Sequence, residues 1–257
     1  ARPVVVTARG TDLNLYPKRY PLVARMIKST ARKVDASITV CTALKEALVD
    51  LGADPKRVHV LRNGVDLSIF LPKDKTDPAT TGRRLRATLL SVGHLIERKG
   101  HDLVIKALSL LPDTELLIAG DGPERHHLER LAVSLGLDDR VRFLGVVRHQ
   151  ALADLYCSAD LLVLASSREG WPNVLLEALA CGTPVVATRN WGTPEIVSAP
   201  EAGCLVDQRT PEAIADAIKK TLAAMPDPAK TRAFAEAFSW DATTDGQVRL
   251  FSSCLKT

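Results

Sequence analysis

The stretch that decides the fold of this chain is residues 161–177, which read LLVLASSREGWPNVLLE. Its first five residues are continuously apolar, as expected for a strand of a parallel sheet that is buried on both faces. Pro172 suits the first position of a helix, where a missing N–H group costs nothing. We therefore expect Glu169 in the loop between strand and helix, and Glu177 within the helix.

The start of that helix offers the chemistry of an anion site. First-turn N–H groups lack intrahelical partners and the positive end of the helix dipole lies there, so a phosphate binds well. Ligands of open α/β sheets bind at the carboxyl ends of strands, where Glu169 falls. Two glutamates at this spacing also occur by chance. A carboxylate on each side of a phosphate site favours a ligand with both phosphate and sugar hydroxyls, such as a nucleotide sugar.

The remaining chain alternates short apolar runs with amphipathic segments, the pattern of an α/β protein with a mainly parallel sheet. Strands are predicted at 3–7, 36–40, 58–61, 87–92, 115–119, 141–144, 161–165, 184–187 and 204–206. Helices are predicted at 21–33, 42–51, 100–110, 124–135, 149–157, 174–180 and 211–224. The polar, proline-punctuated segment 72–84 has no periodicity and indicates a domain boundary.

The bulk composition is that of an ordinary globular protein. With 257 residues, 46% of them hydrophobic, the chain can bury a sizeable core. No run approaches the roughly 18 apolar residues of a membrane span and no segment resembles a signal peptide, so we expect a cytoplasmic protein. The five cysteines are widely spaced in apolar segments, which favours buried reduced thiols over disulfides or a metal site.

The net charge of +4 is unevenly distributed, with +6 on residues 1–71 and −2 on the remainder. In the first predicted helix, Arg25, Lys28 and Arg32 recur at spacings of three and four and would share one face. Two interpretations stay open: peripheral contact with an anionic inner membrane face or an anionic acceptor, and a merely solvated helix face. Nucleic acid is not expected as a partner, because the chain has few aromatic side chains to stack on bases.

Seven short segments, spread over nearly the whole chain, carry a resemblance to a known family. They are Asn63-Gly64-Val65-Asp66 with Phe70 and Pro72; Val92-Gly93-His94-Leu95 with Lys99-Gly100; Ala119-Gly120-Asp121-Gly122-Pro123-Glu124; Phe143-Leu144-Gly145; Leu155-Tyr156 with Ala159-Asp160; Glu169 with Glu177; and Thr193-Pro194-Glu195-Ile196-Val197. Together they resemble the retaining glycosyltransferases of family 4, the glycosyl transferases group 1. The resemblance implies the GT-B fold, in which two Rossmann-like domains are built on doubly wound parallel sheets.

The resemblance also implies a domain organisation. Residues 1–71 correspond to the C-terminal part of the acceptor-side N-terminal domain, and 72–84 to a linker. Residues 85–238 correspond to the donor nucleotide-sugar-binding domain, and 239–257 to a C-terminal helix that crosses back to the first domain. Because the resemblance begins inside the family's first domain, we expect the chain to lack the first part of that domain.

The catalytic group implied by the resemblance consists of Glu169, Lys99 and Arg98. Lys99 and Arg98 follow the strand 87–92 and would meet the diphosphate of the donor. Glu169 would face the donor sugar's hydroxyls near the reacting carbon. Glu177 would accept hydrogen bonds from the ribose hydroxyls, a task that suits an ionised carboxylate.

Further donor contacts implied by the resemblance lie in three turns: Gly93 and His94; Gly145 and Val146; and Asn173, Val174 and Leu175. The first turn would approach the diphosphate. The second would read the edge of the base through its main chain. The third would contact the sugar and the distal phosphate through its backbone N–H groups.

The chain departs from the family pattern at three positions. The family usually has an arginine where His94 stands, so either Arg98 compensates for the missing charge or catalysis is weak. Many members have a histidine where Arg9 stands; an arginine cannot act as a base and would bind an anion or pair with Asp12. Trp191 replaces the more usual second glycine and is expected to narrow the sugar pocket.

Two other features of the sequence bear on cofactors and metals. The Gly120-Asp121-Gly122 segment is a weak dinucleotide signal, and Pro123 favours a tight strand-to-helix turn instead. No Asp-x-Asp occurs and the six histidines show no metal-ligand spacing. We therefore expect no metal and no cofactor apart from the donor substrate, a UDP-sugar or GDP-sugar.

The function so indicated is transfer of a sugar from a nucleotide diphosphate sugar to a glycan or lipid-linked acceptor, with retention of anomeric configuration. Cell-surface polysaccharide or glycolipid synthesis is the expected setting. The departing phosphate itself would take the acceptor proton. The alternatives are a nucleotide-sugar-binding fragment without turnover, or another GT-B enzyme such as a nucleotide-sugar epimerase or a phosphorylase. The ordered set of motifs argues against the epimerase and the phosphorylase.

Overall fold

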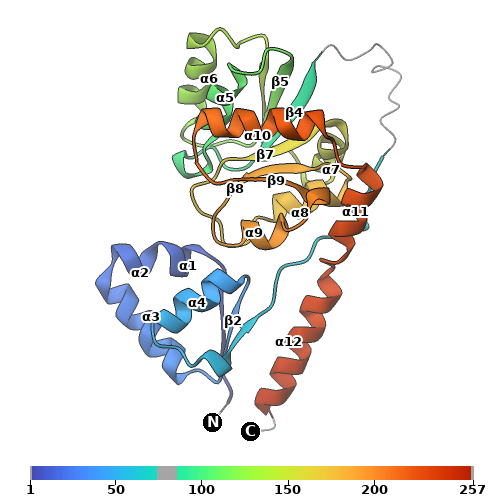
Figure 1. Ribbon diagram of the computed structural model, residues 1–257. Helices are drawn as coiled ribbons and strands as arrows, with labels where there is room; N and C mark the ends of the chain where they lie inside the picture. The colour runs from blue at the N-terminus through green and yellow to red at the C-terminus, as the bar shows by residue number, and fades with distance from the viewer. Residues whose placement is uncertain (1, 74–85, 256–257) are drawn as a thin grey trace.

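The computed structural model describes residues 2–73 and 86–255 and contains two separate parallel sheets (Figure 1). The smaller sheet has the order β1-β2-β3, with β1 (Val5–Ala8), β2 (Ala36–Thr39) and β3 (Val58–Val60). The larger sheet has the order β6-β5-β4-β7-β8-β9. Its strands are β4 (Ala87–Val92), β5 (Thr114–Ala119), β6 (Val141–Gly145), β7 (Leu161–Leu164), β8 (Val185–Thr188) and β9 (Gly203–Val206). All nine predicted strands are present and pair in parallel, which confirms the α/β prediction.

Helices connect most of the strands. We call the smaller sheet with its helices the first unit, and the larger sheet with its helices the second unit. The first unit contains α1 (Thr11–Asn14), α2 (Tyr16–Arg19), α3 (Pro21–Lys33) and α4 (Thr42–Asp50). The second contains α5 (His101–Leu108), α6 (Arg125–Ser134), α7 (His149–Ser158), α8 (Asn173–Ala180), α9 (Thr193–Ile196), α10 (Pro211–Ala223) and α11 (Pro228–Glu236), and α12 (Trp240–Leu255) ends the described chain. The four-residue helices α1, α2 and α9 were not predicted, since one turn is too short for periodicity to show. In the parts of the chain described here, no helix is both long and apolar enough to cross a membrane.

The position of β7 between two cores explains why its residues are continuously apolar. All four are buried, and they alternate between two cores on opposite faces of the larger sheet. Leu162 and Leu164 lie in one core, whereas Leu161 and Val163 lie in the other. A strand with helices on both faces has no polar side, so the period-2 alternation of a half-exposed strand is absent.

The order of the larger sheet reverses beside β4. The chain runs from β4 through β5 to the edge at β6, and then returns to place β7 on the other side of β4. Loops that leave neighbouring strands in opposite directions open a crevice at their carboxyl ends, which is where ligands of such sheets bind. The loops after β4 and β7 carry Lys99 and Glu169.

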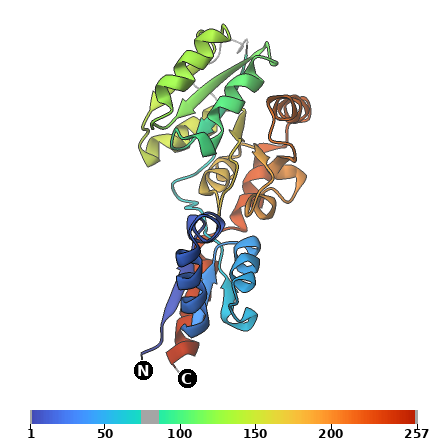
Figure 2. The ribbon, with the colours of Figure 1, turned by 90° about the vertical axis from the view of Figure 1, so that its left-hand side faces the viewer.

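The helix α12 runs back along the smaller sheet, and both termini lie at the same end of the molecule (Figures 1 and 2). Its Leu250 packs with Ala36 and Ile38 of β2 in a small separate core. Thr243 donates a hydrogen bond to the carbonyl of Arg62, which follows β3. Most of the predicted linker 72–84 lies outside the described residues, and the domain boundaries stay a prediction.

Glycines and one indole are among the contacts between the two units. A Cβ on Gly170 would lie 2.0 Å from the carbonyl oxygen of Arg9, so only glycine permits this approach. Trp171 Nε1 donates to the carbonyl of Asn63 at 3.0 Å. The loop after β7 is therefore held between the two sheets.

The strand-end glycine Gly120 gives a test of this packing. Its φ is 144°, and an added Cβ would lie 1.9 Å from the carbonyl oxygen of Gly93. We expect Gly120→Ala to lower the free energy of unfolding by at least about 3 kcal/mol, through backbone strain and the clash. Gly136 also has a positive φ, 65°, but has nothing within 4 Å of an added Cβ. Gly136→Ala should lower the free energy of unfolding by only about 1–2 kcal/mol. Thermal denaturation of both variants measures the difference. Equal losses of stability would contradict the close contact between Gly120 and Gly93.

Candidate functional site

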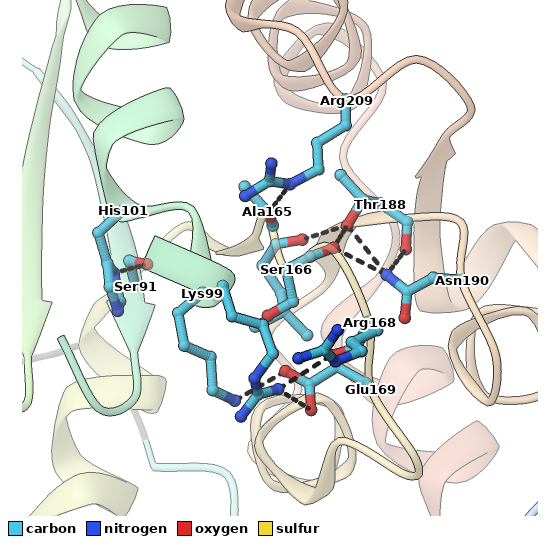
Figure 3. A network of polar contacts seen from close by, with 12 residues as sticks. Ser91, Lys99, His101, Ala165, Ser166, Arg168, Glu169, Thr188, Asn190 and Arg209 are labelled. Atoms are coloured by element: carbon cyan, nitrogen blue, oxygen red, sulfur yellow. Dashed lines mark hydrogen bonds and ion pairs between the residues drawn. The ribbon is translucent and has the colours of Figure 1, made fainter. Parts of the chain in front are cut away.

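The site centres on Glu169, at the carboxyl end of the strand β7. Its side chain is 10% exposed, and Lys99 Nζ donates to its Oε1 at 2.7 Å (Figure 3). Arg98 Nη1 lies 3.7 Å from Oε2. The structure thus brings together the three residues predicted as the catalytic group. A buried carboxylate persists only when a cation and hydrogen bonds replace its hydration, and here two cations do so.

The two cations are anchored by the turn that carries them. Arg98 and Lys99 lie in the 3-10 turn η3 (Glu97–Lys99), which Gly100 joins to α5 with a φ of 70°. Both cations therefore lie in a turn that precedes the helix α5 and not in its first turn, where the dipole would repel them. Arg98 Nη1 also donates to the carbonyl of Arg168 at 3.0 Å, so it fixes the residue next to Glu169.

A set of hydrogen bonds holds the chain leading to Glu169 (Figure 3). The carbonyl of Ser166 accepts from Thr188 Oγ1 at 2.6 Å and from Asn190 Nδ2 at 2.8 Å. Arg209 Nε donates to the carbonyl of Ala165 at 2.7 Å. Thr188 is the last residue of β8, Asn190 follows that strand and Arg209 follows β9, so no spacing in the sequence links these donors to Glu169. Only the strand order of the folded sheet could have revealed them.

The second glutamate, Glu177, has different partners. Tyr156 Oη donates to its Oε2 at 2.8 Å, and His149 Nε2 lies 3.8 Å from its Oε1. Burial raises the pKa of Glu177 above its ordinary value of 4.5, and the hydrogen bond from Tyr156 opposes this effect. The pair Leu155-Tyr156 stood out in the sequence, but nothing there connected the phenol to this carboxylate. The two glutamates belong to separate networks.

The helix α8 starts at Asn173, one residue before the predicted range 174–180 and one residue after the start that Pro172 indicates. Pro172 is the N-cap and Asn173 the first helical residue. The N–H of Leu175 donates to the carbonyl of Pro172 at 3.0 Å, so of the three predicted backbone donors this one is already used. The N–H groups of Asn173 and Val174 belong to the first turn, which has no intrahelical acceptors. The side chain of Asn173 accepts a hydrogen bond from Asn63 Nδ2 of the first unit at 3.2 Å.

The turn after β4 presents His94 in a defined orientation. His94 Nδ1 lies 2.6 Å from the carbonyl oxygen of Asp121. Because a carbonyl only accepts, Nδ1 carries the hydrogen, and the neutral ring then exposes an acceptor at Nε2. Just after β4 and β5, the backbones of Gly93 and Gly120 are in close contact. This packing fits the tight turn predicted at Gly120-Asp121-Gly122.

The turn at the end of β6 is an exposed corner. Gly145 has a φ of 69°, and its carbonyl accepts from the N–H of Gly120 at 2.8 Å. Val146 is 80% exposed. The carbonyl of Gly145 is therefore used within the sheet, and Val146 is the part of this turn that faces solvent.

The residues that depart from the family pattern also have defined surroundings. The carboxylate of Asp12 accepts from the backbone N–H groups of Arg9 and Gly10, at 3.0 and 2.6 Å. Within residues 2–73 and 86–255, Trp191 is the one residue other than glycine with a positive φ, 39°. Such a conformation costs of order 1–3 kcal/mol, and it persists where neighbouring contacts enforce it.

Models of known families match both units of the chain. The model described as "Glycosyl transferases group 1" matches residues 74–237, and "Glycosyltransferase Family 4" matches residues 1–69. A D-inositol 3-phosphate glycosyltransferase of Mycobacteroides abscessus is 38% identical over 208 residues, covering 75% of this chain and 46% of the relative. That of Geodermatophilus obscurus is 37% identical over 252 residues, covering 90% and 55%. The chain spans about half the length of these curated relatives.

Solved structures resemble the whole described arrangement. Sucrose-phosphate synthase of Thermosynechococcus elongatus has a TM-score of 0.86 at 26% identity, covering 98% of this chain and 68% of its own. Anabaena HepE, solved in complex with UDP-glucose, has a TM-score of 0.86 at 22% identity, covering 98% and 72%. The second likeness concerns the fold alone.

The raised pKa of Glu177 predicts a specific dependence of stability on pH. At a pH above 4.5, the ordinary pKa of a glutamate, Glu177 of the folded protein keeps a proton that the unfolded chain has released. The free energy of unfolding therefore falls as pH rises through the window between 4.5 and the raised pKa. Glu177→Gln keeps an acceptor for Tyr156 but has no proton to lose. The melting temperature of the variant minus that of the wild type should therefore increase as pH rises through this window. If the two melting temperatures change in parallel with pH, burial does not raise the pKa of Glu177.

Proposed function

Because this chain belongs to the glycosyl transferases group 1 family, we propose that it binds a nucleotide diphosphate sugar at the carboxyl ends of β4 and β7 and transfers the sugar to an acceptor. The fold implied by the sequence is confirmed: the chain has the GT-B type of arrangement, with two Rossmann-like parallel sheets. The observation that carries the proposal is the buried Glu169 with Lys99 and Arg98, beside the first turn of α8.

The contacts of Lys99 support a role at the diphosphate. An ammonium has three N–H donors, and Glu169 takes one of them. The remaining donors can bind phosphate oxygens while the carboxylate keeps the ammonium in place. In this proposal Lys99 and Arg98 stabilise the negative charge that develops on the departing diphosphate. His94 in its neutral form supplies less charge than an arginine would, so these two cations carry the electrostatic stabilisation.

The two glutamates fit two different parts of the donor. Glu169, next to the cations and the start of α8, would accept hydrogen bonds from the sugar hydroxyls near the reacting carbon. Glu177, held by Tyr156, would accept from the ribose hydroxyls, with the base at the Gly145–Val146 turn. UDP is the first nucleotide to test, since HepE, which shares the fold, was solved with UDP-glucose.

Retention of configuration and the acceptor complete the proposal. Glu169 is held by two cations, which suits hydrogen bonding to hydroxyls better than nucleophilic attack. A front-face reaction, in which the departing phosphate takes the acceptor proton, needs no second carboxylate and gives retention. The relatives named above suggest a cyclitol or sugar acceptor, and synthesis of a cell-surface glycan or glycolipid is the setting we propose.

Peripheral membrane contact is a further part of the proposal. On α3, Leu22 and Met26 are 69% and 61% exposed, and the exposed side chains of Arg25 and Lys28 lie beside them. Apolar and basic side chains on one helix surface suit an anionic lipid interface. Arg32 Nε is instead directed to the carbonyl of Gly52 at 3.4 Å, which takes it partly out of the predicted basic stripe.

Calorimetric titration with UDP and GDP tests the donor site. We expect one of them to bind the chain, and Lys99→Ala and Glu177→Ala each to weaken binding about tenfold or more, because each removes a charged hydrogen-bonding group. Lys106→Ala is the matched control: Lys106 pairs with Asp102 on α5 and is 43% exposed. It should change the affinity less than about twofold.

Thermal denaturation must accompany this titration, because Lys99→Ala leaves Glu169 buried with a weaker partner. Only a variant that stays folded at the titration temperature counts. If neither nucleotide binds the wild-type chain, or if Lys106→Ala matters as much as Lys99→Ala, the donor-site assignment is wrong. Binding of nucleotide without any transfer would favour the alternative of a donor-binding chain that does not turn over.

A further inference from the structure

Cys157 and Cys181 are two free thiols that contact each other where the helices α7 and α8 meet. Cys157 lies in the last turn of α7, and Cys181 is the C-cap of α8. A hydrogen bond joins their side chains. Two thiols in contact are the arrangement from which a disulfide forms.

The backbone around the two thiols brings them together. The Cys181 thiol donates to the carbonyl of Ala153 on α7, at 3.8 Å. In an α-helix this carbonyl also accepts the N–H of the residue four positions later, which is Cys157. Both cysteines are buried, and the helices that carry them pack against each other. A disulfide therefore requires only that the two sulfurs approach to about 2.0 Å.

The surroundings make Cys157 the more acidic of the two thiols. The hydrogen bond from Cys181 lowers the pKa of Cys157 below its ordinary value of 9.0, against the effect of burial, and Lys73 lowers it further. The same hydrogen bond and burial raise the pKa of Cys181. Burial also raises the pKa of Cys41, to about 11. Because the thiolate is the reactive form, Cys157 is the one of these three that reacts first.

The Cys157 sulfur lies just beneath the surface of the protein. Its thiol donates to the carbonyl of Leu71 at 3.2 Å. The side chains of residues 71–73 are exposed, and Lys73 pairs with Asp154 of α7 at the surface. On this side the sulfur is covered by one exposed segment of the chain, which leaves it within reach of a small oxidant such as hydrogen peroxide.

The thiol pair lies beside the contact between Tyr156 and Glu177. Tyr156 precedes Cys157 in α7, and Glu177 lies one turn before Cys181. Tyr156 Oη donates to Glu177 Oε2 at 2.8 Å, and Thr183 Oγ1 donates to the carbonyl of Tyr156 at 2.6 Å. The same two short segments thus carry the thiols and the hydrogen bonds that hold Glu177. A bond between the sulfurs would draw these segments together and disturb the hydrogen bond to Glu177.

We propose that Cys157 and Cys181 are a redox-active thiol pair that a hydroperoxide closes to a disulfide, and that this closure weakens nucleotide binding at Glu177. The second part rests on the function proposed above, whereas the first part does not. Reduction by a dithiol restores both thiols, so the change in affinity is reversible.

The oxidation proceeds in two steps. The Cys157 thiolate attacks one oxygen of hydrogen peroxide, the O–O bond breaks, and the released hydroxide takes up a proton to give water and a sulfenic acid on Cys157. The Cys181 sulfur then attacks the Cys157 sulfur; the S–S bond forms, the S–O bond breaks, and the hydroxyl leaves with the Cys181 proton as a second water. The two thiols lose two electrons, and the peroxide gains them.

Peptide mass spectrometry tests the disulfide. The reduced, folded chain is treated with a small excess of hydrogen peroxide, its remaining thiols are blocked with N-ethylmaleimide in denaturant, and it is digested with trypsin. Cys157 and Cys181 fall in separate tryptic peptides, 149–168 and 169–189. We expect these two peptides linked in one species that dithiothreitol separates. The three other cysteines should be recovered as blocked thiols, although two of them are more exposed than the pair.

Calorimetric titration tests the coupling, with whichever of UDP and GDP binds the reduced chain. The oxidised chain should bind it about fivefold more weakly, because one hydrogen bond to the proposed ribose ligand is disturbed, and dithiothreitol should restore the affinity. Cys157→Ser cannot form the disulfide, so peroxide should change its affinity less than about twofold. Cys181→Ala serves the same purpose if Cys157→Ser does not fold. Cys204→Ser keeps the pair and should respond to peroxide as wild type does.

The outcomes separate this inference from the donor-site proposal. If peroxide leaves both thiols free, carries Cys157 beyond the sulfenic acid, or links other cysteines instead, the thiol pair is wrong. If the disulfide forms but the affinity does not change, or if Cys157→Ser responds as wild type does, the coupling to Glu177 is wrong. If neither nucleotide binds the reduced chain, the donor site fails and the coupling fails with it, while the mass spectrum still decides the disulfide.

Discussion

The buried ion pair between Glu169 and Lys99 is the interaction on which the rest of the site depends. A carboxylate that is 10% exposed has lost most of its hydration, and only a close cation and hydrogen bonds make up for that loss. The ammonium that does so lies on a different loop, 70 residues away in sequence. The two loops meet because β4 and β7 are neighbours in the sheet, although two strands separate them along the chain. The ion pair therefore exists only in this strand order.

The surroundings of the pair leave it little freedom to move. Thr188, Asn190 and Arg209 bind the carbonyls just before Glu169, and Trp171 and Gly170 fix the residues just after it against the first unit. Glu177 is positioned independently by Tyr156. Two carboxylates of the same helix–loop region thus lie in different environments, one neutralised by cations and the other with its pKa raised by burial. This difference is the physical basis for assigning them different hydroxyl groups of one ligand.

Sequence alone predicted the strands and the long helices well, because their apolar periodicity reflects burial directly. It also selected Glu169, Lys99 and Arg98, which the structure brings into contact. It did not find Tyr156 as the partner of Glu177, nor the hydrogen bonds from Asn190 and Arg209, since these depend on which strand ends meet. The occupied N–H of Leu175 and the one-residue shift at Pro172 reflect local geometry at a helix start, which a sequence pattern does not resolve. The strain at Trp191 is a backbone property and has no signature in composition.

The central claim is that one nucleotide sugar spans Lys99, Glu169 and Glu177. A crystal structure of this chain with UDP-glucose bound tests it most directly. We predict phosphate oxygens within hydrogen-bonding distance of Lys99 Nζ, ribose hydroxyls on the Glu177 carboxylate, and glucose hydroxyls on Glu169, with the Lys99–Glu169 contact retained. A nucleotide bound elsewhere, or one whose ribose lies away from Glu177, would contradict the account.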